Sequence, residues 1–207
     1  MARPIAIASS LALVLLAGGA AVLTASAPAT IAAPAPAKAA DVFTVDGVHS
    51  SVVFRIKHMN VAPFYGRFNN AAGTFNLDFA KPDASVLDVS VKTEDVDTAN
   101  AGRDKHLKSE DFFSAKEYPT IAFKGKAFKK TGDTTMEVTG DLTLHGVTKP
   151  VTALVEATGT GKGRGGEAIA GLEAKFTVKR SDFGMTNMVG PIGDEVNLMI
   201  GLEGAKK

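Results

Sequence analysis

The sequence predicts an all-β domain of about eight antiparallel strands, closed as a barrel or folded as a sandwich. Segments of alternating apolar and polar residues recur from residue 51 to residue 204, clusters of turn-forming residues separate them, and long helical periodicity is absent. Alternation with period two places one face of each strand in a dry core and the other in water. On this pattern alone, an interior cavity and a filled core both remain open.

The predicted strands follow one another along the chain. The first is SVVFRIKHM, in which Phe54, Ile56 and His58 share the inward side. The others are GTFNLDF, SVLDVSVKT, TIAFKGKAF, TMEVTGDLTLHG, PVTALVEATG, IAGLEAKFTVKR and EVNLMIGLEG. The separators NNAAG, AKPDA, KKTGD, HGVTKP and GTGKGRGG carry the residues that favour turns. A meander of hairpins therefore accounts for the whole domain.

One short helix is predicted, over KSEDFFSA at residues 108–115. Ser109 can serve as its N-cap, and Glu110 and Asp111 suit the first turn. Phe112 and Phe113 follow, and two adjacent Phe side chains cannot both face water comfortably. We expect this segment to cover one end of the barrel, with its charges outside and its aromatic rings inside.

The first forty residues do not have the composition of a folded domain. Arg3 precedes the apolar run IAIASSLALVLLAGGAAVL, and small residues with Ala-x-Ala sites follow. This order is typical of a secretory signal peptide, predicted over residues 1–27 with cleavage as late as residue 39; an uncleaved anchor is the alternative. An Ala/Pro-rich linker is predicted over residues 28–41, and the barrel domain over residues 42–205. The expected location is the periplasm.

Charge and cysteine content exclude several classes of function. From residue 41 onwards the chain has 21 Lys and Arg and 22 Asp and Glu, so its net charge is about −1. This balance disfavours nucleic acid as a partner. Since the chain has no cysteine, it has no disulfide, no thiolate metal site and no cysteine nucleophile.

Four motifs in fixed order carry a resemblance to a known family. They are VDGVHSSVVFRIKHMNVAPFYGRFNNAAGTF, DTANAGRDKHLKSEDFFSAKEYPTIAFKGK, VTGDLTLHGVTKPV and VKRSDFGMTNMVGPIGDEVNLMIGLE. Together they resemble the YceI-like polyisoprenoid-binding family of secreted bacterial proteins, over nearly the whole domain. The resemblance implies an eight-stranded lipocalin-like barrel with an elongated apolar tunnel for a long isoprenoid or similar amphiphile.

The candidate ligand-binding residues combine this expectation with the inward side of each predicted strand. Twelve apolar residues are predicted to contact the chain of the ligand, and three basic residues are predicted at its polar end. The apolar set is Phe54, Ile56, Phe75, Leu77, Val89, Phe113, Ile121, Phe123, Val138, Leu142, Phe176 and Leu198, and the basic set is His58, Arg103 and His106.

The charged stretch GRDKHLKSEDFF allows more than one interpretation. Asp104 and His106 could form an acid–base pair, but no Gly-x-Ser-x-Gly motif accompanies them. An anionic head group could bind to Arg103, Lys105, His106 and Lys108, or Arg103 could pair locally with Asp104 in a solvated loop. The four histidines lack the close spacing of a zinc site, so no metal and no cofactor is predicted. In RSDFGMTNMVGP, Arg180 is expected to pair with a carboxylate such as Asp182, beside an adaptable Met-rich entrance.

We therefore expect a periplasmic protein that binds or carries a polyisoprenoid, an isoprenoid quinone or a similar lipid. The alternatives are an enzyme acting on such a lipid and a stress-protective structural protein with a filled barrel. Transient membrane contact for loading is expected, nucleic acid is not, and the sequence leaves a homodimer open.

Overall fold

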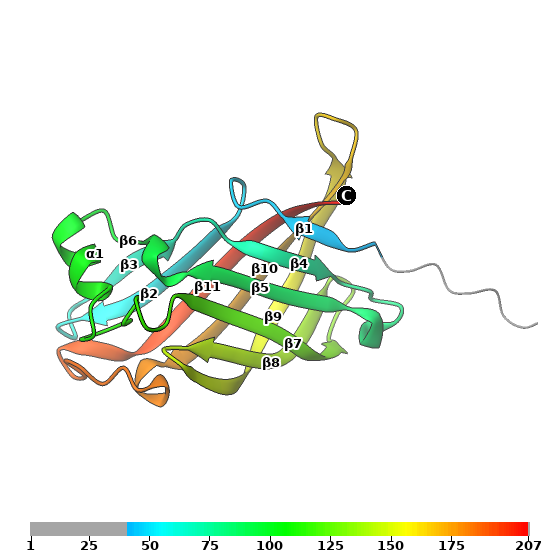
Figure 1. Ribbon diagram of the computed structural model, residues 1–207. Helices are drawn as coiled ribbons and strands as arrows, with labels where there is room; N and C mark the ends of the chain where they lie inside the picture. Colours follow the sequence, from blue (N-terminus) through cyan, green and yellow to red (C-terminus); the bar gives the residue numbers. More distant parts are fainter. Residues whose placement is uncertain (1–40, 207) are drawn as a thin grey trace, which may run out of the picture. The chain divides into compact units, whose positions relative to one another are not determined.

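The computed structural model describes residues 41–206, which form a single antiparallel sheet with one α-helix (Figure 1). Its strands are β1 (Phe43–Val45), β2 (Ser51–His58), β3 (Ala62–Phe68), β4 (Ala72–Asn76), β5 (Val86–Lys92), β6 (Val96–Asp97), β7 (Thr120–Lys130), β8 (Thr135–Leu144), β9 (Val147–Lys162), β10 (Ala168–Lys179) and β11 (Ile192–Lys206). The helix α1 spans Ala101–Leu107, and short 3₁₀ turns occupy η1 (Pro82–Ala84), η2 (Thr93–Asp95) and η3 (Arg180–Phe183). The predicted signal peptide and most of the predicted linker lie outside the described residues.

The sheet closes into a barrel because β11 has partners on both sides. It pairs with β10 on one side and with both β1 and β2 on the other. Strand β1 then pairs with β4, while β2 pairs with β3, so β1 and β2 act as one interrupted strand. Strands β3 and β4 share a second position, and β5 and β6 share a third. The eleven segments thus fill eight positions, which confirms the predicted eight-stranded antiparallel barrel.

The predicted helix is misplaced by about seven residues. Residues 108–115 form turns, and α1 precedes them at Ala101–Leu107. The N-cap is Asn100, whose side-chain oxygen accepts a hydrogen bond from the Arg103 backbone N–H at 2.9 Å. Ser109 instead donates its hydroxyl to the carbonyl of His106 at 2.7 Å. Asn100 therefore satisfies the free N–H group at the start of the helix, the role the sequence had suggested for Ser109.

The barrel interior is filled at the end where β1 and β4 lie. Met136, Val138 and Val155 are fully buried there, and the rings of Phe43 and Phe75 stack with centroids 5.8 Å apart. Toward the end covered by α1, the interior opens into a cavity. The filled end therefore forms the floor of that cavity. No helix among residues 41–206 has the length and apolar character needed to cross a membrane.

Candidate ligand-binding cavity

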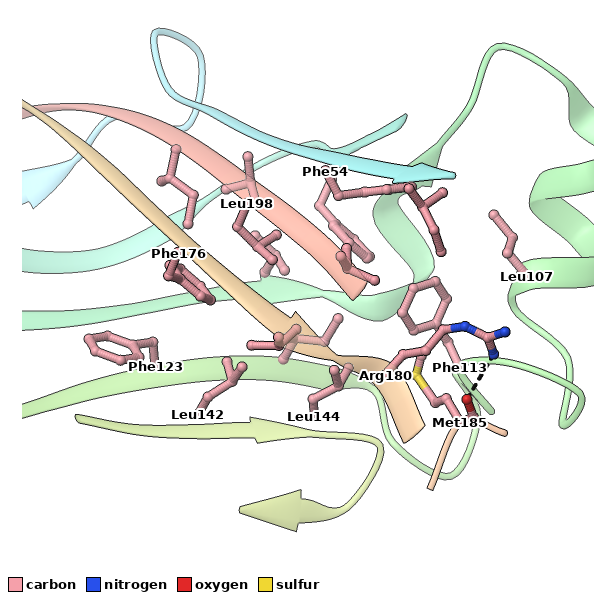
Figure 2. Close-up of a pocket in the computed structure, with 18 of the residues that line it drawn as sticks. Phe54, Leu107, Phe113, Phe123, Leu142, Leu144, Phe176, Arg180, Met185 and Leu198 are labelled. Atoms are coloured by element: carbon pink, nitrogen blue, oxygen red, sulfur yellow. Dashed lines mark hydrogen bonds between the residues drawn. The ribbon is translucent and has the colours of Figure 1, made fainter. Parts of the chain in front are cut away.

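A cavity of about 640 Å³ occupies the half of the barrel nearest α1 (Figure 2). Its wall includes residues of β2, β5, β7, β8, β10 and β11, and the connection that carries α1 covers one end. Ligand pockets in proteins have volumes of about 300–1,000 Å³, so the size is that of a ligand-binding pocket. The cavity contradicts the alternative of a filled barrel.

Twelve of the fifteen predicted site residues lie on this wall. They are Phe54, Ile56, His58, Val89, Arg103, His106, Phe113, Ile121, Phe123, Leu142, Phe176 and Leu198. Most of the apolar members come from inward positions of the strands, as the alternation predicted. Several of them, including Phe123, Phe176 and Leu198, are only partly buried and line the cavity.

The structure places Phe75, Leu77 and Val138 outside the cavity. Phe75 and Val138 are buried in the filled end, and Leu77 packs against the same core. All three face inward, as predicted, but they lie beyond the cavity floor. They are not part of the cavity wall, and their expected contact with a ligand stays a prediction.

Aromatic rings join the strands to the covering segment. Phe68 contacts Phe54 with centroids 5.8 Å apart and Phe113 edge-to-face at 5.4 Å. The backbone N–H of Phe113 donates to the carbonyl of Leu107 at 2.9 Å, which fixes the turn after α1. Phe112 is buried beside it. The covering segment is thus charged outside and aromatic inside, as expected, although the Phe residues follow the helix rather than lying on it.

The ionisable groups on the cavity wall are all basic. They are Lys57, His58, Arg103, His106 and Arg180, and no Asp or Glu lines the cavity within the described part of the chain. His58 ends β2, while Arg103 and His106 belong to α1. Figure 2 shows Arg180 at the same end as Phe113 and Leu107. The polar side of the cavity is therefore the α1 end, and it favours an anionic or hydrogen-bond-accepting group.

Arg103 and Asp104 form no direct ion pair; instead, both side chains form hydrogen bonds with Thr98. The guanidinium of Arg103 donates to the Thr98 hydroxyl and to the Thr98 carbonyl, each at 2.8 Å. Asp104 accepts from the backbone N–H and the hydroxyl of Thr98. The guanidinium also lies 4.3 Å from the centre of the Phe64 ring, within cation–π range. Arg103 therefore has a structural role at the mouth in addition to its place on the wall.

Asp104 and His106 do not form the acid–base pair that the sequence allowed. Asp104 is occupied by Thr98, and Nε2 of His106 lies 2.9 Å from a carboxylate oxygen of Asp111. The His106 ring also contacts Phe112 edge-to-face at 5.0 Å. These partners fix the turn after α1.

Arg180 is 3% exposed and bonds to backbone, which corrects the predicted pairing with Asp182. Its guanidinium donates to the carbonyls of Met185 at 2.8 Å, Asn187 at 2.7 Å, Gly193 at 2.9 Å and Ile192 at 3.1 Å. Burial lowers the pKa of Arg180, and nearby Asp194 partly offsets this. Asp182 lies 3.9 Å from Lys149 instead. Arg180 thus folds the Met-rich segment over the cavity.

Asp194 fastens the other side of the same segment. Its carboxylate accepts from the backbone N–H of Ser181 at 2.9 Å and from the Ser181 hydroxyl at 2.7 Å. Burial acts to raise the pKa of Asp194, but the two hydrogen bonds from Ser181 and the positive charges of Arg180 and Lys179 together outweigh it, so the pKa lies below its ordinary value. The expected Met-rich entrance is placed on the cavity, since Met185 and Met188 both line it.

Several wall residues were not predicted. Lys57, Phe64, Leu107 and Ile192 line the cavity near its mouth. Lys57 lies on the side of β2 that alternation assigned to solvent. Phe64 belongs to a strand that was not predicted, since Pro63 and Gly66 interrupt its pattern. The only sequence signal for Leu107 was its place beside Arg103 and His106.

One group of possible metal ligands lies among the described residues, away from the cavity wall. Asp46, His49 and Glu203 bring their ligand atoms within 4.8 Å of one another. Nδ1 of His49 lies 2.8 Å from the Asp46 carboxylate, and this hydrogen bond raises the pKa of His49. An ion pair accounts for the cluster without a metal.

Comparisons with known proteins agree on one family. The family model described as the YceI-like domain matches residues 43–204. A UPF0312 protein of Azotobacter vinelandii is 41% identical over 170 residues, covering 82% of this chain and 88% of that protein. The YceI protein of Escherichia coli O157:H7 is 42% identical over 162 residues, covering 78% and 84%.

Solved structures show the same barrel. BcnA of Burkholderia cenocepacia superposes with a TM-score of 0.69 at 26% identity, covering 77% of this chain and 98% of that one. The YceI protein of Campylobacter jejuni gives 0.66 at 34% identity, covering 73% and 90%. A domain from Saccharophagus degradans, described as polyisoprenoid-binding, gives 0.62 at 13% identity, covering 81% and 99%, and shows the fold alone. With the barrel, the cavity and the matched sequence in agreement, the chain belongs to the YceI-like family.

Proposed function

We propose that this protein binds or carries a long apolar amphiphile, such as a polyisoprenoid or an isoprenoid quinone, with its chain inside the barrel. The observation that carries the proposal is the cavity of about 640 Å³, whose wall is apolar apart from Ser90 and a few basic groups gathered at one end. Burying apolar surface from water contributes about 25 cal/mol per Å². Such a wall holds a hydrocarbon chain far better than a polar metabolite.

The proposed orientation follows from where the basic groups lie. The tail occupies the deep part between Phe123, Phe176 and Leu198, and the polar end stays near His58 and Arg103 at the α1 end. A carbonyl, a hydroxyl or a phosphate there can accept hydrogen bonds from these side chains. The reverse orientation would bury a polar group against the apolar floor without a partner.

Membership of the YceI-like family and the apolar wall of the cavity both support lipid binding. The solved neighbour described as polyisoprenoid-binding supports the same class of ligand through its shared fold. We also place the protein in the periplasm, on the sequence of its first forty residues. Cell fractionation followed by mass determination of the mature N-terminus tests that placement.

The test of binding is native mass spectrometry of the purified protein, followed by organic extraction and identification of the lipid. A stoichiometric isoprenoid or fatty adduct is expected. Ala174, buried on β10, lines the cavity, and Ala174→Phe should fill it and abolish the adduct. Ala168→Phe, at the exposed start of the same strand, is the matched control and should retain it. An apo mass that persists with added prenyl lipids would overturn the proposal.

A further inference from the structure

Two turns meet at the mouth of the cavity. The first joins β2 to β3 at residues 59–61, and the second is the segment 186–191 that precedes β11. The backbone N–H of Met59 donates to the carbonyl of Pro191 at 2.6 Å, and the Asn60 side chain donates to the carbonyl of Gly190 at 3.2 Å. Both turns lie at the α1 end of the barrel (Figure 1). They form one surface, which we call the mouth rim.

The mouth rim presents apolar side chains to solvent. Met59 is 56% exposed, Val61 83% and Val189 44%. Met188 is similarly exposed and also lines the cavity, so the rim continues into the wall. These four account for half of the large apolar side chains exposed among the described residues. Such a concentration around one opening marks an interaction site.

Met59 and Met188, the two methionines of the mouth rim, have an unusual backbone conformation. Met59 and Asn60 have φ of 52° and 56°, and Met188 has φ of 54°. Left-handed backbone costs an ordinary residue about 1–2 kcal/mol and is normally given to Gly, Asn or Asp. Asn60 fits that preference, whereas two exposed methionines do not. Their positions are better explained by a need for apolar, adaptable side chains at the rim than by the conformation of the turns.

The basic groups beside the mouth rim indicate which kind of surface it contacts. The five charged or titratable groups on the cavity wall are basic, and the wall carries no carboxylate among the described residues. Asp111, which pairs with His106, lies outside the wall. Apolar side chains on protruding turns, beside a basic opening, complement the surface of an anionic bilayer.

We propose that the mouth rim docks on an anionic phospholipid bilayer, so that a lipid passes between the bilayer and the cavity without crossing water. Met59, Val61, Met188 and Val189 enter the interface, while Lys57 and Arg103 face the lipid phosphates. A protein partner fits less well, because a standard protein interface uses about 20–30 residues a side and the rim offers two short turns. The inference rests on the proposed function, since the cavity supplies the reason to dock.

The test is flotation of the full chain with vesicles of phosphatidylglycerol and phosphatidylcholine in equal amounts, against vesicles of phosphatidylcholine alone. The rim variant is Met59→Asn, Val61→Thr and Val189→Thr combined. None of these residues lines the cavity, and Asn suits the left-handed turn better than Met. The control is Val48→Thr, because Val48 is 86% exposed but precedes β2 at the far end of that strand. All variants keep the same N-terminal segment, so differences between them report on the rim.

The rim variant should bind anionic vesicles about tenfold or more weakly than the unchanged chain, and the control should bind equally well. The binding should also fall with added salt and with loss of phosphatidylglycerol. Equal binding by the rim variant would overturn the proposal. Capture by a membrane protein, with no binding to protein-free vesicles, would overturn it as well.

A parallel titration with a prenyl quinone, without vesicles, separates this proposal from the previous one. The rim variant should take up the quinone as the unchanged chain does. If neither chain takes it up while docking still depends on the rim, the proposed function fails and docking stands. If both take it up and both dock equally, docking on the rim fails and the proposed function stands.

Discussion

The ring of Phe54 covers the backbone of Gly66 on the neighbouring strand. The two residues are directly paired in the β2–β3 register. A Cβ atom on residue 66 would lie 2.3 Å from Cζ of Phe54 and under 3.0 Å from both Cε atoms. The missing side chain of Gly66 is therefore what allows Phe54 to lie against the wall, and it helps to set the width of the cavity.

Gly66→Ala should push the Phe54 ring into the cavity and weaken ligand binding. The displaced ring takes space that the ligand chain would occupy, so the affinity should fall by roughly tenfold, which corresponds to about 1.4 kcal/mol. Long prenyl chains should lose more affinity than short ones, because they need the full width. Titration with prenyl lipids of increasing length measures the effect.

The matched control for Gly66→Ala is Gly161→Ala on β9. A Cβ there meets only side-chain atoms of Ile169, at 3.6 and 3.7 Å, which is ordinary contact. Its affinities should match those of the unchanged chain. Equal affinities for Gly66→Ala across the whole series would show that the ring does not limit the cavity.

Arg180→Lys should destabilise the protein by about 3 kcal/mol or more. Lysine cannot reproduce the planar guanidinium that reaches four carbonyls from Met185 to Gly193, and buried carbonyls left without donors are costly. Urea unfolding measures the change. Arg55→Lys is the control, because Arg55 makes one side-chain bond, to Asn197, and should cost little. A similar small loss in both variants would contradict the role given to Arg180.

Alternation predicted the antiparallel strands, and the family resemblance implied their closure into a barrel, but neither predicted the depth of the cavity. Period two tells which side chains face inward, and Phe54, Phe123 and Val138 all do. It does not tell where along the barrel axis the interior is filled, which depends on side chains from strands far apart in sequence. Val138 belongs to the same buried cluster as Met136 and Val155 in the filled half, so it was predicted in the cavity and found in the core.

The shortest strands were not predicted from the sequence, for a different reason. Strands β1 and β6 have three and two residues, too few for alternation to be recognised. The role of Arg180 could not be predicted from the sequence either, because its partners are backbone carbonyls, which every residue possesses. Asp182 was the nearest opposite charge in sequence, and only the path of the backbone shows that Arg180 turns toward the loop instead.

Thr98→Val should loosen the segment that covers the cavity. The Thr98 hydroxyl bonds to both Asp104 and Arg103, so its loss leaves two charged groups short of a partner and should cost about 1–3 kcal/mol. Thr139→Val is the control, since Thr139 shares an exposed hydroxyl pair with Thr152 on the barrel wall. Hydrogen exchange of α1 measures the loosening.

A double-mutant cycle tests whether Thr98 acts through Asp104. If it does, Thr98→Val combined with Asp104→Asn should cost clearly less than the sum of the single changes, because each change breaks the same bond. Additive costs, with unchanged exchange in α1, would place the effect of Thr98 elsewhere.

The lowered pKa of Asp194 predicts how the stability contributed by its contact with the Met-rich segment depends on pH. Its pKa in the folded protein lies below the ordinary value of 3.8, because burial opposes the charged carboxylate less than the Ser181 hydrogen bonds, Arg180 and Lys179 together favour it. A group with a lowered pKa contributes stability that is fully present above its unfolded pKa. That contribution is lost as the pH falls through the folded pKa.

The measurement compares the unchanged chain with Asp194→Asn by urea unfolding at a series of pH values. The difference in unfolding free energy should be constant near neutral pH and should shrink as the pH falls below about 4. Asp46 and Asp97 also have lowered pKa values, so the acid response of the unchanged chain alone mixes several groups. Subtracting the two curves removes the contribution of the groups that both chains share. A difference in unfolding free energy that stays constant down to strongly acid pH would show that the Ser181–Asp194 contact does not titrate as the structure predicts.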